Sequence, residues 1–181
     1  DSLLAITLGL EKGWNWISHN LASPVHTSRF TSYAQHIVGQ HESLIKEDDN
    51  GWSGTLDGMN TAMGYKVRMA SAIDITLRGT LFDVNTPVSV MQGWNWVGFP
   101  LYNATTIEAA LKDYSPAEGD AIVGINAFAV YEDGKWVGSL TSLSPGQAYL
   151  FKCENPQTFC WNSLTAPVLH RARRYNAPEE D

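Results

Sequence analysis

The sequence has little positive charge and no long apolar run. Its 12 Lys and Arg residues are outnumbered by 19 Asp and Glu residues, which gives a formal net charge of −7. Binding to a nucleic-acid backbone needs a basic surface, so this acidity argues against a nucleic-acid partner. No stretch approaches the roughly 18 consecutive apolar residues of a transmembrane helix. We therefore expect neither nucleic-acid binding nor membrane insertion.

The sequence also lacks the motifs of common enzyme and metal sites. It contains no Gly-x-Ser-x-Gly elbow, phosphate loop or Gly-x-Gly-x-x-Gly fingerprint. His36 and His41 have a spacing seen in some zinc sites, but no cysteine pair accompanies them. The acidic segment 47–51 lacks the regular spacing and the distal Glu of a calcium loop. We expect no catalytic residue, metal or cofactor; a Ser/His/Asp or carboxylate-pair site assembled from distant residues stays an alternative.

Cysteine is scarce, and the two cysteines lie close together in the sequence. Cys153 and Cys160 flank residues 155–157, a turn-like Asn-Pro-Gln stretch. If this turn closes a hairpin, the two side chains face each other and could form a disulfide, which would indicate an oxidising compartment. The alternative is two buried thiols, because Met69 and Thr76 occupy the matching places in the first half of the chain.

Tryptophan, in contrast, is abundant, and six of the seven tryptophans form three matched pairs. The motif Gly-Trp-Asn-Trp-Ile at 13–17 returns as Gly-Trp-Asn-Trp-Val at 93–97. Trp-x-Gly-x-Leu at 52–56 returns at 136–140. Further matched pairs are Tyr65 and Tyr149, Leu8 and Val88, and Leu10 and Val90. Because tryptophan is rare, this agreement indicates an internal duplication, and that duplication decides the architecture.

We therefore predict a predominantly β protein of the α+β type, built from two tandem, structurally equivalent units. Residues 4–84 form the first unit and residues 85–162 the second, each with five to six short antiparallel strands and one short helix. Residues 163–181 are expected to be a linker or tail that leads to a neighbouring domain. Its basic cluster, Arg171, Arg173 and Arg174, is interpreted as a solvated segment.

Local signals place some of these elements. Asp133 and Gly134 between alternating segments predict a tight hairpin. Thr105 with Glu108 is a capping-box pattern that predicts a short helix in the second unit, whereas the first unit has only a weak helical signal at 28–35. The last predicted hairpin pairs residues 64–69 with 73–77 in the first unit and residues 148–153 with 158–161 in the second.

The paired tryptophans allow two interpretations. Trp14 and Trp16 share one face of a strand by its period of two, and with Trp52 opposite they would form a platform for sugar rings. The interpretation we favour makes them core anchors, because the glycine at position 54 leaves room for an indole against the backbone. The candidate ligand-binding residues are Trp14, Trp16, Trp52, Trp94, Trp96 and Trp136. Trp161 has no match and is expected to pack near the cysteines.

Three motifs carry a resemblance to a known group of proteins: residues 13–18, 52–56 and 64–68. Together they resemble the tandem GWNW-type repeat modules of large secreted or surface multidomain proteins of Bacteroidetes-type bacteria. Ala148 departs from the Gly-Tyr that this pattern expects, whereas Gly64 keeps it. The resemblance covers most of residues 4–162. It implies an extracellular location and an accessory role, and no catalytic motif comes with it.

These observations predict a non-catalytic extracellular module of a secreted or cell-surface bacterial protein. Its role would be spacing, adhesion or presentation of a neighbouring domain. Its partners would be other domains of the same polypeptide and a glycan or a host or surface protein. The alternative is a carbohydrate-binding module that uses exposed Trp faces. An enzyme domain would instead require a cleft with perturbed titratable groups.

Overall fold

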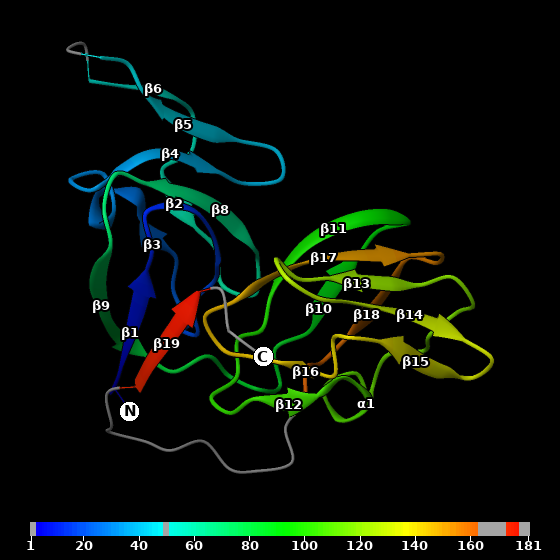
Figure 1. Cartoon of the computed structure of the whole chain (residues 1–181). Helices are drawn as coiled ribbons and strands as arrows, with labels where there is room; N and C mark the ends of the chain where they lie inside the picture. Colours follow the sequence, from blue (N-terminus) through cyan, green and yellow to red (C-terminus); the bar gives the residue numbers. More distant parts are fainter. Residues whose placement is uncertain (1–2, 49–50, 163–172, 178–181) are drawn as a thin grey trace.

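The chain folds into two β-rich units with the same strand order. The computed structural model describes residues 3–48, 51–162 and 173–177, and half of the protein is in strands against 4% in helices (Figure 1). The first five-stranded antiparallel sheet has the order β2 (Gly13–Ile17), β8 (Tyr65–Met69), β4 (Ala34–Val38), β5 (Ser43–Lys46) and β6 (Trp52–Gly54). The second has the order β11 (Gly93–Gly98), β17 (Ala148–Cys153), β13 (Ala121–Val123), β14 (Phe128–Glu132) and β15 (Lys135–Gly138). The predicted fold class is confirmed.

Smaller sheets complete each unit. The longest pair joins β1 (Leu3–Leu10) to β9 (Ile73–Thr80), and its counterpart joins β10 (Val88–Val90) to β18 (Gln157–Phe159). Two short pairs join β3 (Val25–His26) to β7 (Gly58–Met59) and β12 (Thr105–Thr106) to β16 (Ser142–Leu143). Each unit therefore consists of one five-stranded sheet and two smaller pairings, of which the β1–β9 pairing of the first unit is the longest.

Each unit has its own hydrophobic core, and the two cores use equivalent positions. Ile17, Ile37 and Val67 are fully buried in the first core. Val97, Ile122 and Phe151 occupy the matching places in the second core and are also buried. The first core draws on residues 6–77 with Tyr102 and the second on residues 82–161. Trp161 is buried in the second core, edge-on to the rings of Phe99 and Phe159.

The predicted final hairpin is wrong in both units. β8 has β2 on one side and β4 on the other, so it offers no edge to β9, which pairs with β1 instead. In the same way β17 lies between β11 and β13, and β18 pairs with β10. Cys153 therefore lies opposite Gly93, and Cys160 follows a strand of another sheet. The cross-hairpin geometry behind the predicted disulfide is not found, and both cysteines are free thiols.

The helices are shorter than the sequence patterns suggest. The second unit has α1 (Ile107–Ala110), but its N-cap is Thr106, whose hydroxyl accepts from the Ala109 N–H at 3.4 Å. The predicted cap residue, Thr105, lies one position before the actual cap, and both residues belong to β12. The first unit has only a 3-10 turn, η1 (Thr27–Arg29), capped by His26. It cannot extend further, because the chain enters β4 only a few residues later.

Part of the predicted linker returns to the first unit. Residues Arg173–Ala177 form β19, which pairs in parallel with β1, from Arg173 opposite Ile6 to Ala177 opposite Leu10 (Figure 1). The other residues expected in the linker, including Arg171, lie outside the described residues, as do Asp49 and Asn50 of the acidic turn.

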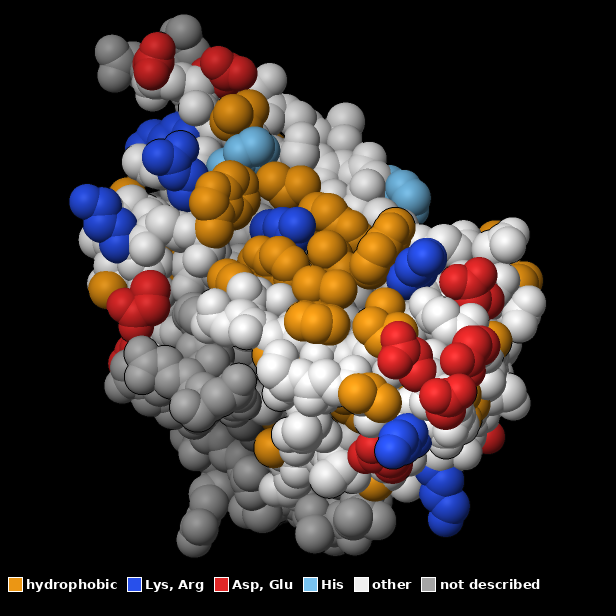
Figure 2. Space-filling view, turned by 45° about the vertical axis from the view of Figure 1, so that its right-hand side comes forward, with side chains coloured by type: hydrophobic (Ala, Val, Ile, Leu, Met, Phe, Trp, Pro, Cys, Tyr) orange, Lys and Arg blue, Asp and Glu red, His pale blue; other side chains and the backbone are white. Residues whose placement is uncertain are grey.

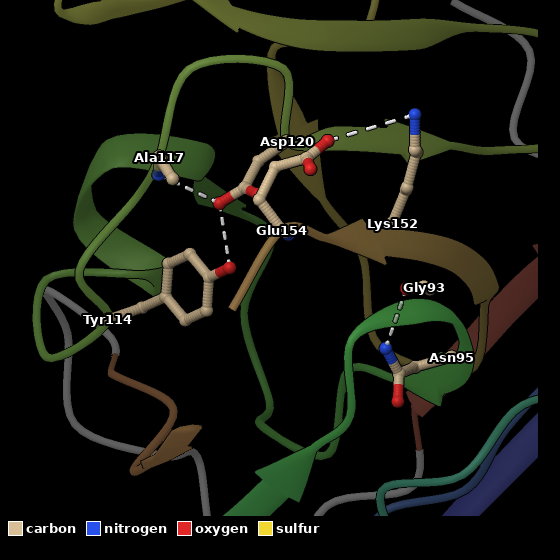
Figure 3. A network of polar contacts seen from close by, with 7 residues as sticks. All are labelled: Gly93, Asn95, Tyr114, Ala117, Asp120, Lys152 and Glu154. Carbon is tan, nitrogen blue, oxygen red and sulfur yellow. Dashed lines mark hydrogen bonds and ion pairs between the residues drawn. The ribbon is translucent and has the colours of Figure 1, made fainter. Parts of the chain in front are cut away.

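A buried carboxylate organises the entrance to β13 in the second unit. Asp120 is inaccessible to solvent and accepts from the Tyr114 hydroxyl at 2.7 Å, the Ala117 N–H at 2.9 Å and the Glu154 N–H at 2.8 Å (Figure 3). Burial, together with hydrogen bonds to Cys153 and Asp120, raises the pKa of Tyr114. Burial likewise raises the pKa of the Cys153 thiol to about 11. The Tyr114 hydroxyl and the Cys153 thiol therefore stay protonated at neutral pH.

His19 is the buried titratable group of the first unit. Its ring is 1% exposed, its Nε2 lies 2.7 Å from the Met59 carbonyl oxygen, and its Nδ1 accepts from the Leu21 N–H at 3.2 Å. A neutral ring with its proton on Nε2 satisfies both neighbours, whereas a proton on Nδ1 would break the second bond. Burial lowers the pKa of His19. The matching residue of the second unit is the buried Phe99.

We predict that this histidine makes the protein less stable in mild acid. Below the unfolded-state pKa of about 6.5 the unfolded chain binds a proton that the folded chain resists, so the free energy of unfolding falls as pH falls. Urea unfolding between pH 8 and pH 5 measures the slope. His19→Phe, which copies the second unit, should flatten it, and His41→Gln at an exposed position should not. Equal slopes for all three proteins would contradict the assignment.

The free thiols give a second prediction. At pH 8 a thiol reagent should modify one cysteine of the folded protein, Cys160, because the Cys153 thiol is buried and its pKa is raised. Denaturant should release the second thiol. Peptide mass mapping assigns the modified residue. Modification of Cys153 before Cys160 would be inconsistent with this packing, and a protein with no reactive thiol even after unfolding would indicate the disulfide.

Candidate binding face

The asparagine of the Gly-Trp-Asn-Trp motif is its buried part. Asn15 is inaccessible to solvent and closes the turn between β1 and β2. Its Oδ1 accepts from the Glu11 N–H at 3.0 Å, and its Nδ2 donates to the carbonyl oxygens of Glu11 at 2.9 Å and Gly13 at 3.1 Å. Nδ2 also lies 3.4 Å from the Val67 carbonyl oxygen on β8. One amide thus fixes both the turn and the neighbouring strand.

The second unit repeats this arrangement. Asn95 Oδ1 accepts from the Met91 N–H at 2.9 Å, and its Nδ2 donates to Met91 O at 2.9 Å and to Gly93 O at 3.2 Å (Figure 3). Gly13 and Gly93 have φ of +92° and +95°, a conformation that favours glycine. Successive side chains of a strand point to opposite faces. Since the asparagines point inward, the tryptophans on either side of them point outward.

The structure accordingly places no paired tryptophan in the fully buried core. Trp14 is 44% exposed and Trp94 is 48% exposed, and Trp16 and Trp96 are half-buried. Trp52 and Trp136 are half-buried and pack against the edges of the two cores. The favoured prediction of core anchors is therefore wrong for the Gly-Trp-Asn-Trp motifs. The inward positions of these strands are taken by asparagine and by Ile17 and Val97.

The glycine of Trp-x-Gly-x-Leu has a different purpose from the predicted one. Gly54 has φ of +134°, and a Cβ there would collide with the carbonyl oxygen of Ser43 on the adjacent strand. Gly138 has φ of +144° and faces the Phe128 carbonyl oxygen in the same way. The glycine is needed for the close approach of two strand backbones, and it makes no room for an indole.

The two units meet at matched positions, which brings their tryptophans together. Ile17 bridges to Gln147, and its counterpart Val97 bridges to Met63, the residue that matches Gln147. The matching hydrogen bonds run from Ser18 N–H to Gly146 O and from Gly98 N–H to Ala62 O, each at 3.0 Å. Each contact has its counterpart with the units exchanged, as approximate two-fold symmetry requires.

A lysine links the tryptophans of the two units. The Nζ of Lys66 lies 4.4 Å from the ring centroid of Trp16 and 4.6 Å from that of Trp96, close enough for a cation–π interaction with each. Burial lowers the pKa of Lys66. Its counterpart on β17 is Leu150, so among the described residues one cation lies over these two rings. We name the surface formed by Trp14, Trp16, Trp94, Trp96, Lys66 and Leu150 the tryptophan face. Figure 2 shows a continuous hydrophobic area with a basic group inside it.

The first unit also holds the edge strand of the second unit in place. The Gln40 side chain donates from Nε2 to the Trp94 carbonyl oxygen at 2.8 Å and accepts at Oε1 from the Trp96 N–H at 2.9 Å. This double hydrogen bond fixes the backbone that carries both indoles. Gln40 was not predicted, because nothing in its sequence surroundings indicates a contact with the other unit.

Other chemistry is sparse in the described part of the chain. Within residues 3–48, 51–162 and 173–177, no group of three or more His, Cys, Asp or Glu side chains is placed to hold a metal ion. His36 and His41 do not come together with further ligands. Among the described helices, none has the length and apolar character to cross a membrane.

Loss of a motif asparagine should destabilise the protein. Asn15→Leu or Asn95→Leu leaves the polar groups of the turn without a partner, and we expect each change to lower the free energy of unfolding by about 2 kcal/mol or more. Denaturant titration measures the effect. Asn60→Ala, at an exposed position, is the control and should change stability little. A small effect at positions 15 and 95 would argue against the role of these amides in holding the strands.

Comparison of the chain with protein-family models, curated proteins and solved structures finds no match.

Proposed function

We propose that the chain is a non-catalytic binding module of an extracellular bacterial protein and that its tryptophan face binds carbohydrate. The observation that carries the proposal is the outward placement of four indoles from two adjacent sheets. Exposed clusters of large apolar side chains generally mark interaction sites. Indole rings provide flat apolar surface for the CH groups of a sugar ring, and the indole N–H provides a polar handle.

The rigidity of the backbone beneath the indoles supports this proposal. Both motif strands are tied by the asparagine amides, and the second is tied again by Gln40. A surface that is already ordered loses little conformational entropy when a ligand binds. The backbone that carries the four rings is therefore held in place before a ligand binds.

Spacing, adhesion or presentation of a neighbouring domain is the second candidate. The observation that favours it is the pair of β-bridges that joins the two units through backbone atoms, at Ile17 with Gln147 and at Met63 with Val97. Two units joined in this way would hold attached domains at a constant separation. The resemblance to modules of secreted or surface proteins agrees with either role, and other domains of the same polypeptide or a host or surface protein would then be partners.

Substitution of the exposed indoles tests the carbohydrate proposal. Trp14→Ala and Trp94→Ala should each weaken binding to an oligosaccharide found by glycan array at least about tenfold, a loss of ~1.4 kcal/mol. Isothermal titration calorimetry measures the affinity. Val137→Ala, at an exposed position on β15 at the far edge of the second sheet, should leave it unchanged.

Stability must be measured alongside affinity. Trp161→Ala removes a buried ring and should cost about 3–5 kcal/mol, whereas the two exposed substitutions should cost clearly less. If Trp14→Ala or Trp94→Ala unfolds the protein as Trp161→Ala does, these rings act in folding. If the folded variants keep full affinity, the ligand binds elsewhere. Either result would remove the tryptophan face as the binding site.

A further inference from the structure

The tryptophan face of the first unit continues into a pocket with basic walls. The rings of Trp14 and His36 lie 5.5 Å apart, and His36 also lines a cavity of about 390 Å³. The residues that line the cavity are Gln35, His36, Ile45, Lys46, Asp48 and Arg68. Arg68 lies between Trp14 and His36 in the sheet, because it pairs with Trp14 on one side and with His36 on the other. We name this cavity the basic pocket.

The cations of the basic pocket lack ionic partners within the described residues. Neither Lys46 nor Arg68 forms an ion pair with a described residue, whereas Lys152 pairs with Glu154 at 3.8 Å. Asp48 is the acidic side chain of the pocket wall and lies beyond ion-pair distance of both cations. Figure 2 shows basic groups next to the hydrophobic area of a chain whose net charge is −7.

The corresponding place in the second unit has a different character. There Ala121 stands in the place of His36 and Lys152 in the place of Arg68. Ala121 lies opposite Lys152 across the strands, as His36 lies opposite Arg68. Lys46 is replaced by Tyr131, opposite the tryptophan of β15. Lys152 is the residue already engaged by Glu154. The basic pocket is thus a property of one unit, whereas the indoles beside it are shared by both.

We infer that the glycan bound by the tryptophan face is acidic and that its carboxylate or sulfate group enters the basic pocket. This inference rests on the proposed carbohydrate function. A sugar ring stacked on Trp14 would place a ring substituent near the guanidinium of Arg68, whose planar set of donors suits such anions. Lys46, on β5 of the same sheet, also lines the basic pocket and adds a second charge. Lys66 lies between Trp16 and Trp96 and places a further cation where the next sugars of the bound oligosaccharide would lie.

Matched oligosaccharides separate the charge from the sugar ring. A glycan array with neutral, carboxylated and sulfated oligosaccharides selects the class. Calorimetry then compares hexagalacturonate, its methyl ester and a κ-carrageenan hexasaccharide at low salt. The acid should bind at least about tenfold tighter than its methyl ester, since esterification removes the charge and keeps the ring. Carrageenan carries sulfate alone, so its affinity relative to the galacturonate tells which anionic group the basic pocket selects.

Variants assign that preference to the basic pocket. Lys46→Gln combined with Arg68→Gln should lower the affinity for the acid about tenfold and leave binding of the methyl ester unchanged. Lys152→Gln, the counterpart of the arginine change, should have little effect. Equal loss in the Lys152→Gln control would reduce the preference to general charge attraction and overturn the inference.

Two further outcomes distinguish the inference from the function on which it rests. If neutral glycans bind as well as acidic ones and Trp14→Ala abolishes that binding, the carbohydrate function stands and the acidic preference is wrong. If no glycan of any class on the array binds, both are wrong, and the face is a contact surface for another domain or protein.

Discussion

The side-chain amides of Asn15 and Asn95 determine the orientation of both motif strands. Each amide bonds to both backbone groups of a turn residue and to two further carbonyl oxygens, one of them on the neighbouring strand. A buried amide without hydrogen-bond partners is costly. If either strand shifted its register by one residue, its asparagine would point outward and all of these hydrogen bonds would be lost. This constraint places Ile17 and Val97 in the cores and turns the tryptophans to the surface. The face exists because the asparagines are buried.

The duplication allowed two equivalent β-rich units to be predicted, and matched strands do occupy matched places in the two larger sheets. Alternation identified strands but not their partners, so β8 and β9 were assigned to one hairpin although they belong to different sheets. The same limitation affected the tryptophans. A period of two places Trp14 and Trp16 on one face, but it does not say which face is buried, and the interpretation of the glycine in Trp-x-Gly-x-Leu favoured the wrong one. The answer depended on the hydrogen-bonding capacity of the residue between them.

The close contact between the two units explains two of the sequence differences between the repeats. Position 64 is glycine and its counterpart 148 is alanine, and a Cβ at Gly64 would lie 2.8 Å from the Cβ of Ala148. A Cβ at Gly98 would likewise collide with Ser18, its own counterpart. Near a two-fold axis matched residues meet each other, so one member of each pair must be small. The departure of Ala148 from the repeated Gly-Tyr pattern is tolerated because Gly64 keeps it.

Asymmetry at this junction also gives the face a direction. Two lysines at positions 66 and 150 would place like charges between the same two indoles, whereas the lysine and leucine present place one cation there. Basic groups then continue toward Trp14 through Arg68 and Lys46, whereas toward Trp94 the counterpart of Arg68 is Lys152, which pairs with Glu154, and the counterpart of Lys46 is Tyr131. Four indoles alone would treat both directions along a bound chain alike. The cations beside Trp14 have no ionic partner among the described residues, whereas the lysine beside Trp94 is paired with Glu154. A ligand with an anionic group therefore gains more in one orientation than in the other, so the divergence of the first unit converts a symmetric surface into one that distinguishes the ends of its ligand.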